Sequence, residues 1–255
     1  MGDVAKADLP YRCYLLLDDD VREKLKAIHT HALDFWLARG SVAIIAGLQM
    51  LIINRLSVGP RWLAPALEIA LLIPLSMVTA WTQEQVRTAT TDYHWHVIAL
   101  RRRAIRMGAV ALTALVTLLN FGSLILLVRA LLGGKLGASG HTLLLDAINI
   151  WITNVIAFAL WYWSIDRGGP AARGLVVVAT DDFLFPQMVQ GQQHAAGWSP
   201  GFIDYFYVSF TNASAFSPTD TMPLTVRAKL LMTVEAAISL LTLALVAARA
   251  VNILA

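Results

Sequence analysis

The sequence is poor in charged residues and in cysteine. Charged residues make up 15% of its 255 residues and hydrophobic residues 57%, whereas soluble domains carry about 25% charged residues. The net charge of +3 is small, and the basic residues flank apolar runs, which is typical of membrane-helix ends and not of a nucleic-acid-binding surface. The single cysteine, Cys13, excludes an intrachain disulfide and a Cys-x-x-Cys site. The composition therefore predicts an integral membrane protein with no nucleic-acid partner.

Motifs of enzymes and cofactor-binding proteins are also missing. The sequence contains no GxGxxG, P-loop, HExxH or nucleophile-elbow pattern. Two histidine pairs, His29 with His31 and His94 with His96, have members two residues apart. That spacing points the rings to different faces of a helix, which is unsuitable for a metal site. We therefore expect no enzyme activity, no cofactor and no metal.

Five apolar segments are long enough to cross a bilayer, whose core of about 30 Å requires about 20 apolar residues in a helix. They are residues 34–56, 62–81, about 107–132, 142–165 and 224–254. The expected fold class is all-α integral membrane, with five transmembrane helices and the re-entrant segment described below.

Basic residues gather in two segments and predict the orientation. The N-terminal segment contains Lys6, Arg12, Arg22, Lys24 and Lys26, and the segment after the second span contains Arg87, Arg101, Arg102, Arg103 and Arg106. Both segments also have helical patterns and are expected to extend membrane helices at the interface. By the positive-inside rule we expect a cytoplasmic N-terminus and, with five crossings, an external C-terminus.

The segment before the last span is short, aromatic and polar. Ser199 as N-cap and Pro200 at the first helical position predict a helix over GFIDYFYVSFTNA. Its length of about 14 residues, or about 21 Å, is too short to cross a membrane. The polar run with Pro218 then breaks it, and Pro223 stands where the last helix is expected to begin. This order predicts a re-entrant loop, whose short helix points its negative dipole end at cations.

Residues 142–254 resemble the pore unit of the potassium-channel family, with an outer helix, pore helix, filter and inner helix. The matching details are YFYVSFT, Asp220 three residues before Pro223, and the basic pair Arg227 and Lys229. The whole chain is also similar to an uncharacterised bacterial family of multi-helix membrane proteins with a channel-pore-like C-terminus. The FLFP at 183–186 and the closing AVNIL fit the pattern of that family.

The resemblance implies a homotetramer in a bacterial plasma membrane, with small cations and the lipid bilayer as partners. The candidate pore residues are Asn212 and the seven positions that match the family filter TTVGYGD, namely Ser214, Ala215, Phe216, Ser217, Pro218, Thr219 and Asp220. Ser217 and Thr219 replace the two filter glycines, and Pro218 lacks an N–H. Because stacked filter carbonyls require glycine-like backbone angles, we do not expect a potassium-type filter.

Glu235 and Glu68 are ionisable residues inside predicted spans, where a charge is costly and usually functional. Glu235 is expected either to face a cavity and attract cations or to hold helices together as a hydrogen-bonded carboxyl. Glu68, six residues before the helix-kinking Pro74, is expected either to form a second polar site or to lie shallow enough to be hydrated. Four more polar residues are expected to hold helices together. They are Asn120, Asp146, Asn149 and Asn154.

These observations predict three parts and one preferred function. Residues 1–33 form a cytoplasmic amphipathic segment, residues 34–140 form three accessory helices with a basic loop, and residues 141–255 form the pore-like unit. The expected function is passive conduction of small cations. Two alternatives remain: a non-conducting scaffold or sensor plugged by Phe216 and Pro218, and an ion- or proton-coupled transporter that uses Glu68 and Glu235.

Overall fold

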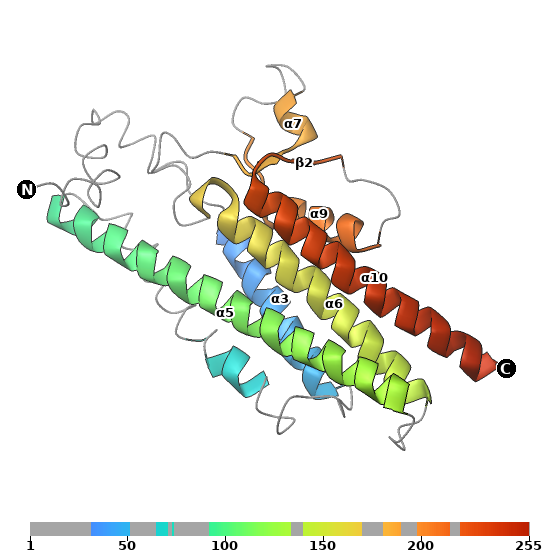
Figure 1. The fold of residues 1–255 in the computed structure, drawn as a ribbon. Helices are drawn as coiled ribbons and strands as arrows, with labels where there is room; N and C mark the ends of the chain where they lie inside the picture. Colours follow the sequence, from blue (N-terminus) through green and yellow to red (C-terminus); the bar gives the residue numbers. More distant parts are fainter. Residues whose placement is uncertain are drawn as a thin grey trace, which may run out of the picture.

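A computed structural model describes residues 32–51, 65–70, 73, 92–133, 140–169, 181–189, 198–214 and 220–254. Its main helices are α3 (Ala32–Leu51), α5 (Asp92–Gly133), α6 (Gly140–Ile165), α9 (Phe202–Ser214) and α10 (Val226–Leu254). The short elements are η1 (Asp166–Gly168), β1 (Phe183–Leu184), α7 (Pro186–Val189) and β2 (Met222–Pro223). Residues 65–70 are also helical. The described part of the chain is a helical bundle (Figure 1), as the sequence predicts.

Three helices are long and apolar enough to cross a membrane. The apolar stretches are Ala104–Leu131 in α5, Thr142–Ile165 in α6 and Val226–Ala248 in α10. They coincide with three of the five predicted spans and support a membrane protein. Helix α3 coincides with the first predicted span, whereas most of the second, residues 62–81, lies outside the described residues.

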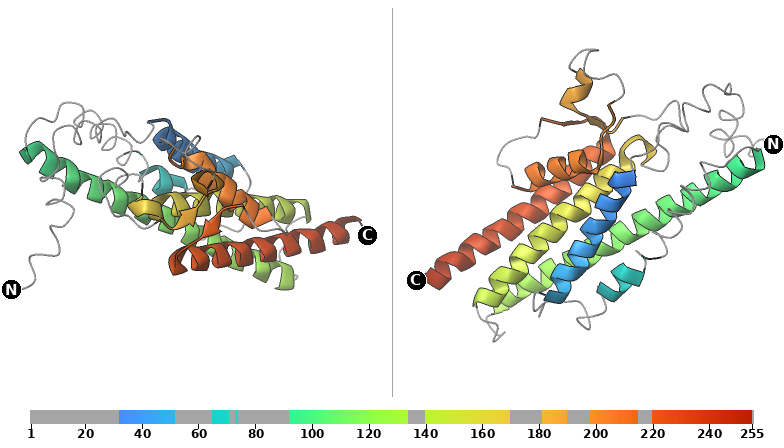
Figure 2. Two further views of the ribbon diagram at one scale, coloured as in Figure 1. Left: turned by 90° about the horizontal axis from the view of Figure 1, so that it is seen from above. Right: turned by 180° about the vertical axis from the view of Figure 1, so that it is seen from behind.

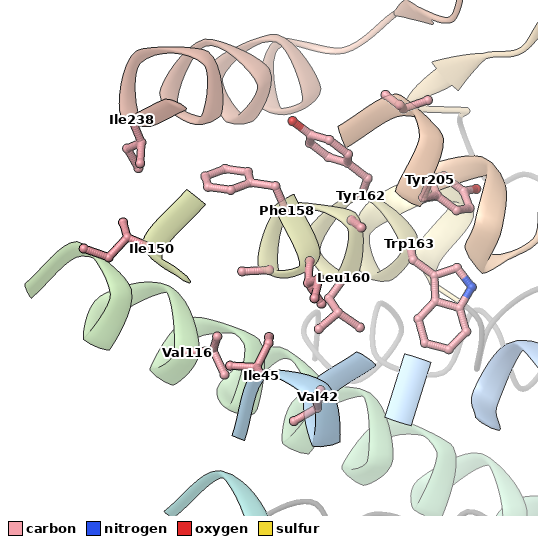
Figure 3. Close-up of a cluster of buried hydrophobic side chains, with 14 of the residues drawn as sticks. Val42, Ile45, Val116, Ile150, Phe158, Leu160, Tyr162, Trp163, Tyr205 and Ile238 are labelled. Carbon is pink, nitrogen blue, oxygen red and sulfur yellow. The ribbon is translucent and has the colours of Figure 1, made fainter. Parts of the chain in front are cut away.

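Helix α6 lies at the centre of the bundle. Within the chain 72% of its apolar stretch is buried, against 33% for the stretch in α5 and 22% for that in α10. Figure 2 shows α3, α5 and α10 arranged around it. In Figure 3, Phe158 and Leu160 of α6 lie among side chains from these neighbours. The neighbours labelled there include Val42, Ile45, Val116 and Ile238. A helix that is apolar all round requires such enclosure or a membrane.

Helices α3, α5 and α10 all run opposite to α6 (Figure 1). The amide of Asn120 on α5 donates to the carbonyl oxygen of Ile150 at 3.1 Å, and the Trp161 indole donates to Thr117 at 3.0 Å. Helix α5 has 42 residues, or about 63 Å, and its N-terminal part extends past the bundle (Figure 1). Over residues 92–106 the basic segment is thus helical and continuous with the apolar stretch of α5, as predicted; residues 84–91 lie outside the described residues. The N-terminal helical pattern lies outside the described residues.

The FLFP segment folds onto the C-terminal end of α6. Strand β1 pairs antiparallel with β2, Phe183 opposite Pro223. The Phe183 ring lies 5.1 Å from that of Tyr162, and the Phe185 ring lies 5.4 Å from that of Tyr205. The FLFP segment therefore links α6, α9 and the start of α10.

Two predicted helix starts are wrong by a few residues. Pro223 lies in β2, and α10 begins at Val226, after Thr225, whose hydroxyl oxygen accepts from the N–H of Ala228 at 3.4 Å. This is an N-cap bond, which ends the extended segment and starts the helix.

Helix α9 begins at Phe202, not at Pro200, because carboxylates cap it in place of Ser199. Asp204 accepts from the N–H of Gly201 at 2.7 Å, and Asp34 of α3 accepts from the N–H of Phe202 at 3.2 Å. A side chain at position 201 would place its Cβ 2.9 Å from Asp34 Oδ1, which explains the glycine. The length of 13 residues is close to the prediction.

Candidate functional site

Helix α9 packs between α6 and α10 and covers only half of α6. At its N-terminal end the Phe202 ring lies 5.8 Å from that of Trp163. At its C-terminal end the carbonyl oxygen of Ala213 accepts from the Trp151 indole at 3.4 Å. Trp151 and Trp163 are about 18 Å apart along α6 at 1.5 Å per residue. Helix α9 therefore runs from the C-terminal end of α6 to about its middle.

The carboxylate of Glu235 joins α10 to α6 and α9. The side chain is fully buried. Its Oε1 accepts from the hydroxyl of Ser209 on α9, and its Oε2 accepts from the hydroxyl of Tyr162 on α6. The amide of Asn212, also on α9, donates to Oε2 at 2.6 Å. The Ser209 hydroxyl is also 2.7 Å from the carbonyl oxygen of Val155 on α6, and its single hydrogen serves one of these two acceptors at a time.

Further polar groups surround Glu235 and complete what we call the Glu235 cluster (Tyr162, Ser209, Asn212, Glu235, Asn154 and Ser239). Asn154 of α6 donates to Ser239 of α10 at 2.9 Å and to the carbonyl oxygen of Glu235 at 3.4 Å. Asn212 also donates to the carbonyl oxygen of Met232 at 3.0 Å. These bonds confirm the prediction that Asn154 holds helices together, as the Asn120 bond does between α5 and α6. Asp146 and Asn149, named with them, are buried on α6.

A second polar cluster holds the other ends of α9 and α10. Asp182 is fully buried and pairs with Arg227 of α10 through Nε at 2.6 Å and a terminal guanidinium nitrogen at 2.5 Å. Asp166, also fully buried, accepts from the N–H of Asp182 at 2.7 Å and from the Tyr205 hydroxyl of α9 at 2.5 Å. Helix α9 is thus held at its N-terminal half by Asp166 and at its C-terminal half by Glu235.

The Arg227–Asp182 pair is expected to couple by about 1–3 kcal/mol, because bidentate hydrogen bonds to a buried carboxylate are stronger than neutral ones. Because the Arg227 side chain is half exposed, the expected coupling free energy is smaller than that of a fully buried pair. A double-mutant cycle with Asp182→Asn and Arg227→Met, measured by denaturant unfolding in detergent, gives this coupling. The control is Lys229→Met on the same turn, which is expected to change stability by less than about 0.5 kcal/mol. Additive effects of the two changes would show that the pair contributes nothing.

The structure places the two ends of the predicted filter. Asn212 and Ser214 lie in the last turn of α9, where the Ser214 hydroxyl donates to the carbonyl oxygen of Phe210 at 2.6 Å. Asp220 is exposed in a bend before β2. The positions between them, Ala215, Phe216, Ser217, Pro218 and Thr219, lie outside the described residues. The Asn212 amide donates to Glu235, so this side chain holds α9 against α10.

The two carboxyls singled out in the predicted spans, Glu235 and Glu68, lie in different parts of the bundle. Glu235 is enclosed by α6 and α9 of its own chain, the arrangement of a carboxyl that holds helices together. Glu68 is fully buried in the helical segment 65–70, where its Oε1 accepts from the amide of Gln49 on α3 at 3.0 Å. Within the described part of the chain, no three His, Cys, Asp or Glu side chains gather closely enough to hold a metal ion.

Tyr162, Ser209 and Asp34 contribute to these contacts but were not singled out from the sequence. One signal for Ser209 was available, since Ser209 and Asn212 are three residues apart and share a helix face. Glu235, Ser239 and Thr242 have the same kind of spacing on α10, and all three are buried. The outward face of α10 is apolar instead. It exposes Val226, Leu230, Val234, Leu240 and Leu241.

Comparison of the chain with protein-family models, with curated proteins and with solved structures gives no match.

Proposed function

We propose that the protein is a pore-loop membrane protein that conducts small cations passively as a homotetramer. The observation that carries this proposal is the position of α9. The helix ends about halfway along α6, whereas Met222 and Pro223 pair with β1 near the C-terminal end of α6. Helix α9 therefore ends at mid-depth, and the chain is back at the end of the bundle where α9 begins before α10 starts. Irregular backbone at such depth is tolerated where it is buried in protein or lines a wet cavity.

The helix directions support the expected five crossings. Helices α3 and α5 both begin at the end of the bundle where α6 finishes (Figure 1). The connection between them, residues 52–91, therefore joins opposite ends of the bundle, which leaves room for the predicted second span at 62–81. The basic N-terminal part of α5 and the basic pair Arg227 and Lys229 lie at this same end. By the positive-inside rule it is the cytoplasmic end, and the loop after α9 enters from that side.

The uncovered face of α10 supports an assembly of several copies. One unit of α6, α9 and α10 encloses no pore, and only 22% of the apolar stretch of α10 is buried within the chain. Four copies around an axis would bring this face of α10 against neighbouring copies. The C-terminal, negative end of α9 then faces the loop, which favours cations. Ser214, Ser217, Thr219 and Asp220 form the constriction in this proposal, and Glu235 fixes α9.

Purified protein in liposomes is expected to pass sodium or potassium ions down a concentration gradient. Ser217→Ala removes one hydroxyl from the proposed constriction and is expected to reduce the flux about fivefold, the factor that corresponds to about 1 kcal/mol. The matched control is Ser123→Ala on α5, whose hydroxyl donates to the carbonyl oxygen of Leu119 in its own helix. This control is expected to conduct like the unmodified protein.

Two results of the flux measurement would contradict the proposal. Absence of flux under every gradient and voltage would identify a non-conducting protein, as expected if Phe216 and Pro218 plug the loop. Flux that appears only with a proton gradient would identify a coupled transporter. Equal flux with Ser217→Ala would remove Ser217 from the constriction while leaving conduction itself intact.

A further inference from the structure

The side chains of Glu68 and Gln49 form one hydrogen bond, but each keeps one oxygen that no hydrogen reaches. The Gln49 amide nitrogen donates to Glu68 Oε1 at 3.0 Å. The remaining oxygen of each group, Glu68 Oε2 and Gln49 Oε1, is buried and has no hydrogen-bond partner in the structure. An unpaired carboxylate oxygen in an apolar interior costs several kcal/mol. Some group must therefore satisfy these two acceptors.

A single proton satisfies both oxygens. Two acceptors cannot bond each other, but a proton on Glu68 Oε2 makes that atom a donor for the amide oxygen of Gln49. The acid and the amide then share two parallel hydrogen bonds in a ring, one of which the structure already contains. Reversing the amide exchanges its nitrogen and oxygen and leaves the same deficit of one hydrogen.

We propose that Glu68 and Gln49 form a proton-binding site in which Glu68 is the neutral acid. A divalent cation does not fit, because such ions require several oxygen ligands and the described residues contain no cluster of three acidic, histidine or cysteine side chains. The titratable groups described on the surrounding helices are Asp34 and Arg39 on α3, Arg106 and Arg129 on α5, and Asp146 on α6; among the described contacts Glu68 forms no ion pair with any of them. Arg39 is ten residues from Gln49, about 15 Å along the helix, and lies over the ring of Trp36 at 5.6 Å. It is too distant to neutralise a carboxylate at Glu68.

This proton site is separate from the pore-like unit and does not depend on the proposed conduction. It joins α3 to residues 65–70, whereas the Glu235 cluster joins α6, α9 and α10. Uptake or release of the proton would change the contact between the accessory helices. The bonds that hold α9 would remain in place.

Infrared spectroscopy of the purified protein in lipid membranes tests the site. The spectrum of the unmodified protein minus that of Glu68→Gln is expected to contain the carbonyl band of a carboxylic acid at neutral pH, shifted to lower frequency in D2O. Gln49→Leu removes both partner atoms and is expected to move this band to higher frequency, because the acid loses its hydrogen bonds. The control is Met50→Leu, at the neighbouring exposed position of α3, which is expected to leave the band in place.

Three results would overturn the proposal. The first is a difference spectrum without the acid band, which would show that Glu68 is ionised. The second is a band that Gln49→Leu does not move, which would show that the pair does not share the proton. The third is loss of the band when sodium is added at constant pH, which would assign the site to a monovalent cation. Should Glu68→Gln fail to fold, comparison of Gln49→Leu with Met50→Leu still decides between these outcomes.

Discussion

Replacement of Glu235 by alanine is expected to destabilise the protein by about 3–5 kcal/mol, because it leaves buried donors without an acceptor and opens a cavity. The change removes the acceptor of the Tyr162 hydroxyl and of one Asn212 N–H. It also removes the Ser209 contact of α10, although the Ser209 hydroxyl keeps the carbonyl oxygen of Val155. Each unsatisfied buried donor costs about 1–3 kcal/mol. Because two of these donors lie on α9, the helix is expected to detach from α10, and cation flux is expected to disappear. Denaturant unfolding in detergent and flux in liposomes measure the two effects.

Two matched variants distinguish the roles of Glu235. Glu235→Gln keeps an acceptor oxygen and the side-chain volume, so it is expected to lose less than half as much stability as Glu235→Ala. Val234→Ala truncates the adjacent residue, which faces outward, and is expected to cost about 1 kcal/mol or less. Equal stability of Glu235→Ala and Val234→Ala would show that the cluster does not hold α9. Loss of flux with unchanged stability would instead place Glu235 in the conduction path.

Asp166→Ala is expected to release the FLFP segment and the N-terminal half of α9 at a cost of about 3–4 kcal/mol. The change removes the acceptor for the N–H groups of Asp182 and Phe183 and for the Tyr205 hydroxyl. Each of the three donors left without an acceptor costs about 1–3 kcal/mol. Because water can hydrogen-bond some of them, the total is expected to be smaller than the sum. Loss of these bonds is expected to expose residues 181–189 to protease. Limited proteolysis and denaturant unfolding measure the change.

Two control variants distinguish how much each of the three hydrogen bonds of Asp166 contributes to stability. Tyr205→Phe removes one of them and is expected to cost about 1 kcal/mol, with little change in proteolysis. Asp166→Asn keeps an acceptor oxygen and is expected to lie between the two. If Asp166→Ala and Tyr205→Phe were equally stable, the bonds to the N–H groups of Asp182 and Phe183 would contribute nothing to stability.

Within the described residues, the sequence alone determined three of the segments that are helical and long enough to cross a membrane. Thr142–Ile165 coincides with the predicted fourth span, and the short helix before the last span has 13 residues where about 14 were expected. These features depend on the apolar character of consecutive residues, which the hydropathy of the sequence measures directly. The start of α10 is misplaced because Pro223 belongs to β2 and the local cap is Thr225. The start of α9 is misplaced in part because one of its caps comes from another helix. Asp34 caps a helix that begins 168 residues later.

Only the tertiary structure decided what the polar residues do. The sequence marked Glu235 as a costly carboxyl but left open whether it faces a cavity or holds helices together. Its partners Tyr162 and Ser209 are 73 and 26 residues away in the chain, and only the packing of α9 between α6 and α10 brings them to it. The partner of Glu68, Gln49, is likewise supplied by another helix. Hydrogen-bond partners from distant segments depend on how helices pack, and the hydropathy of a single segment carries no information about that packing.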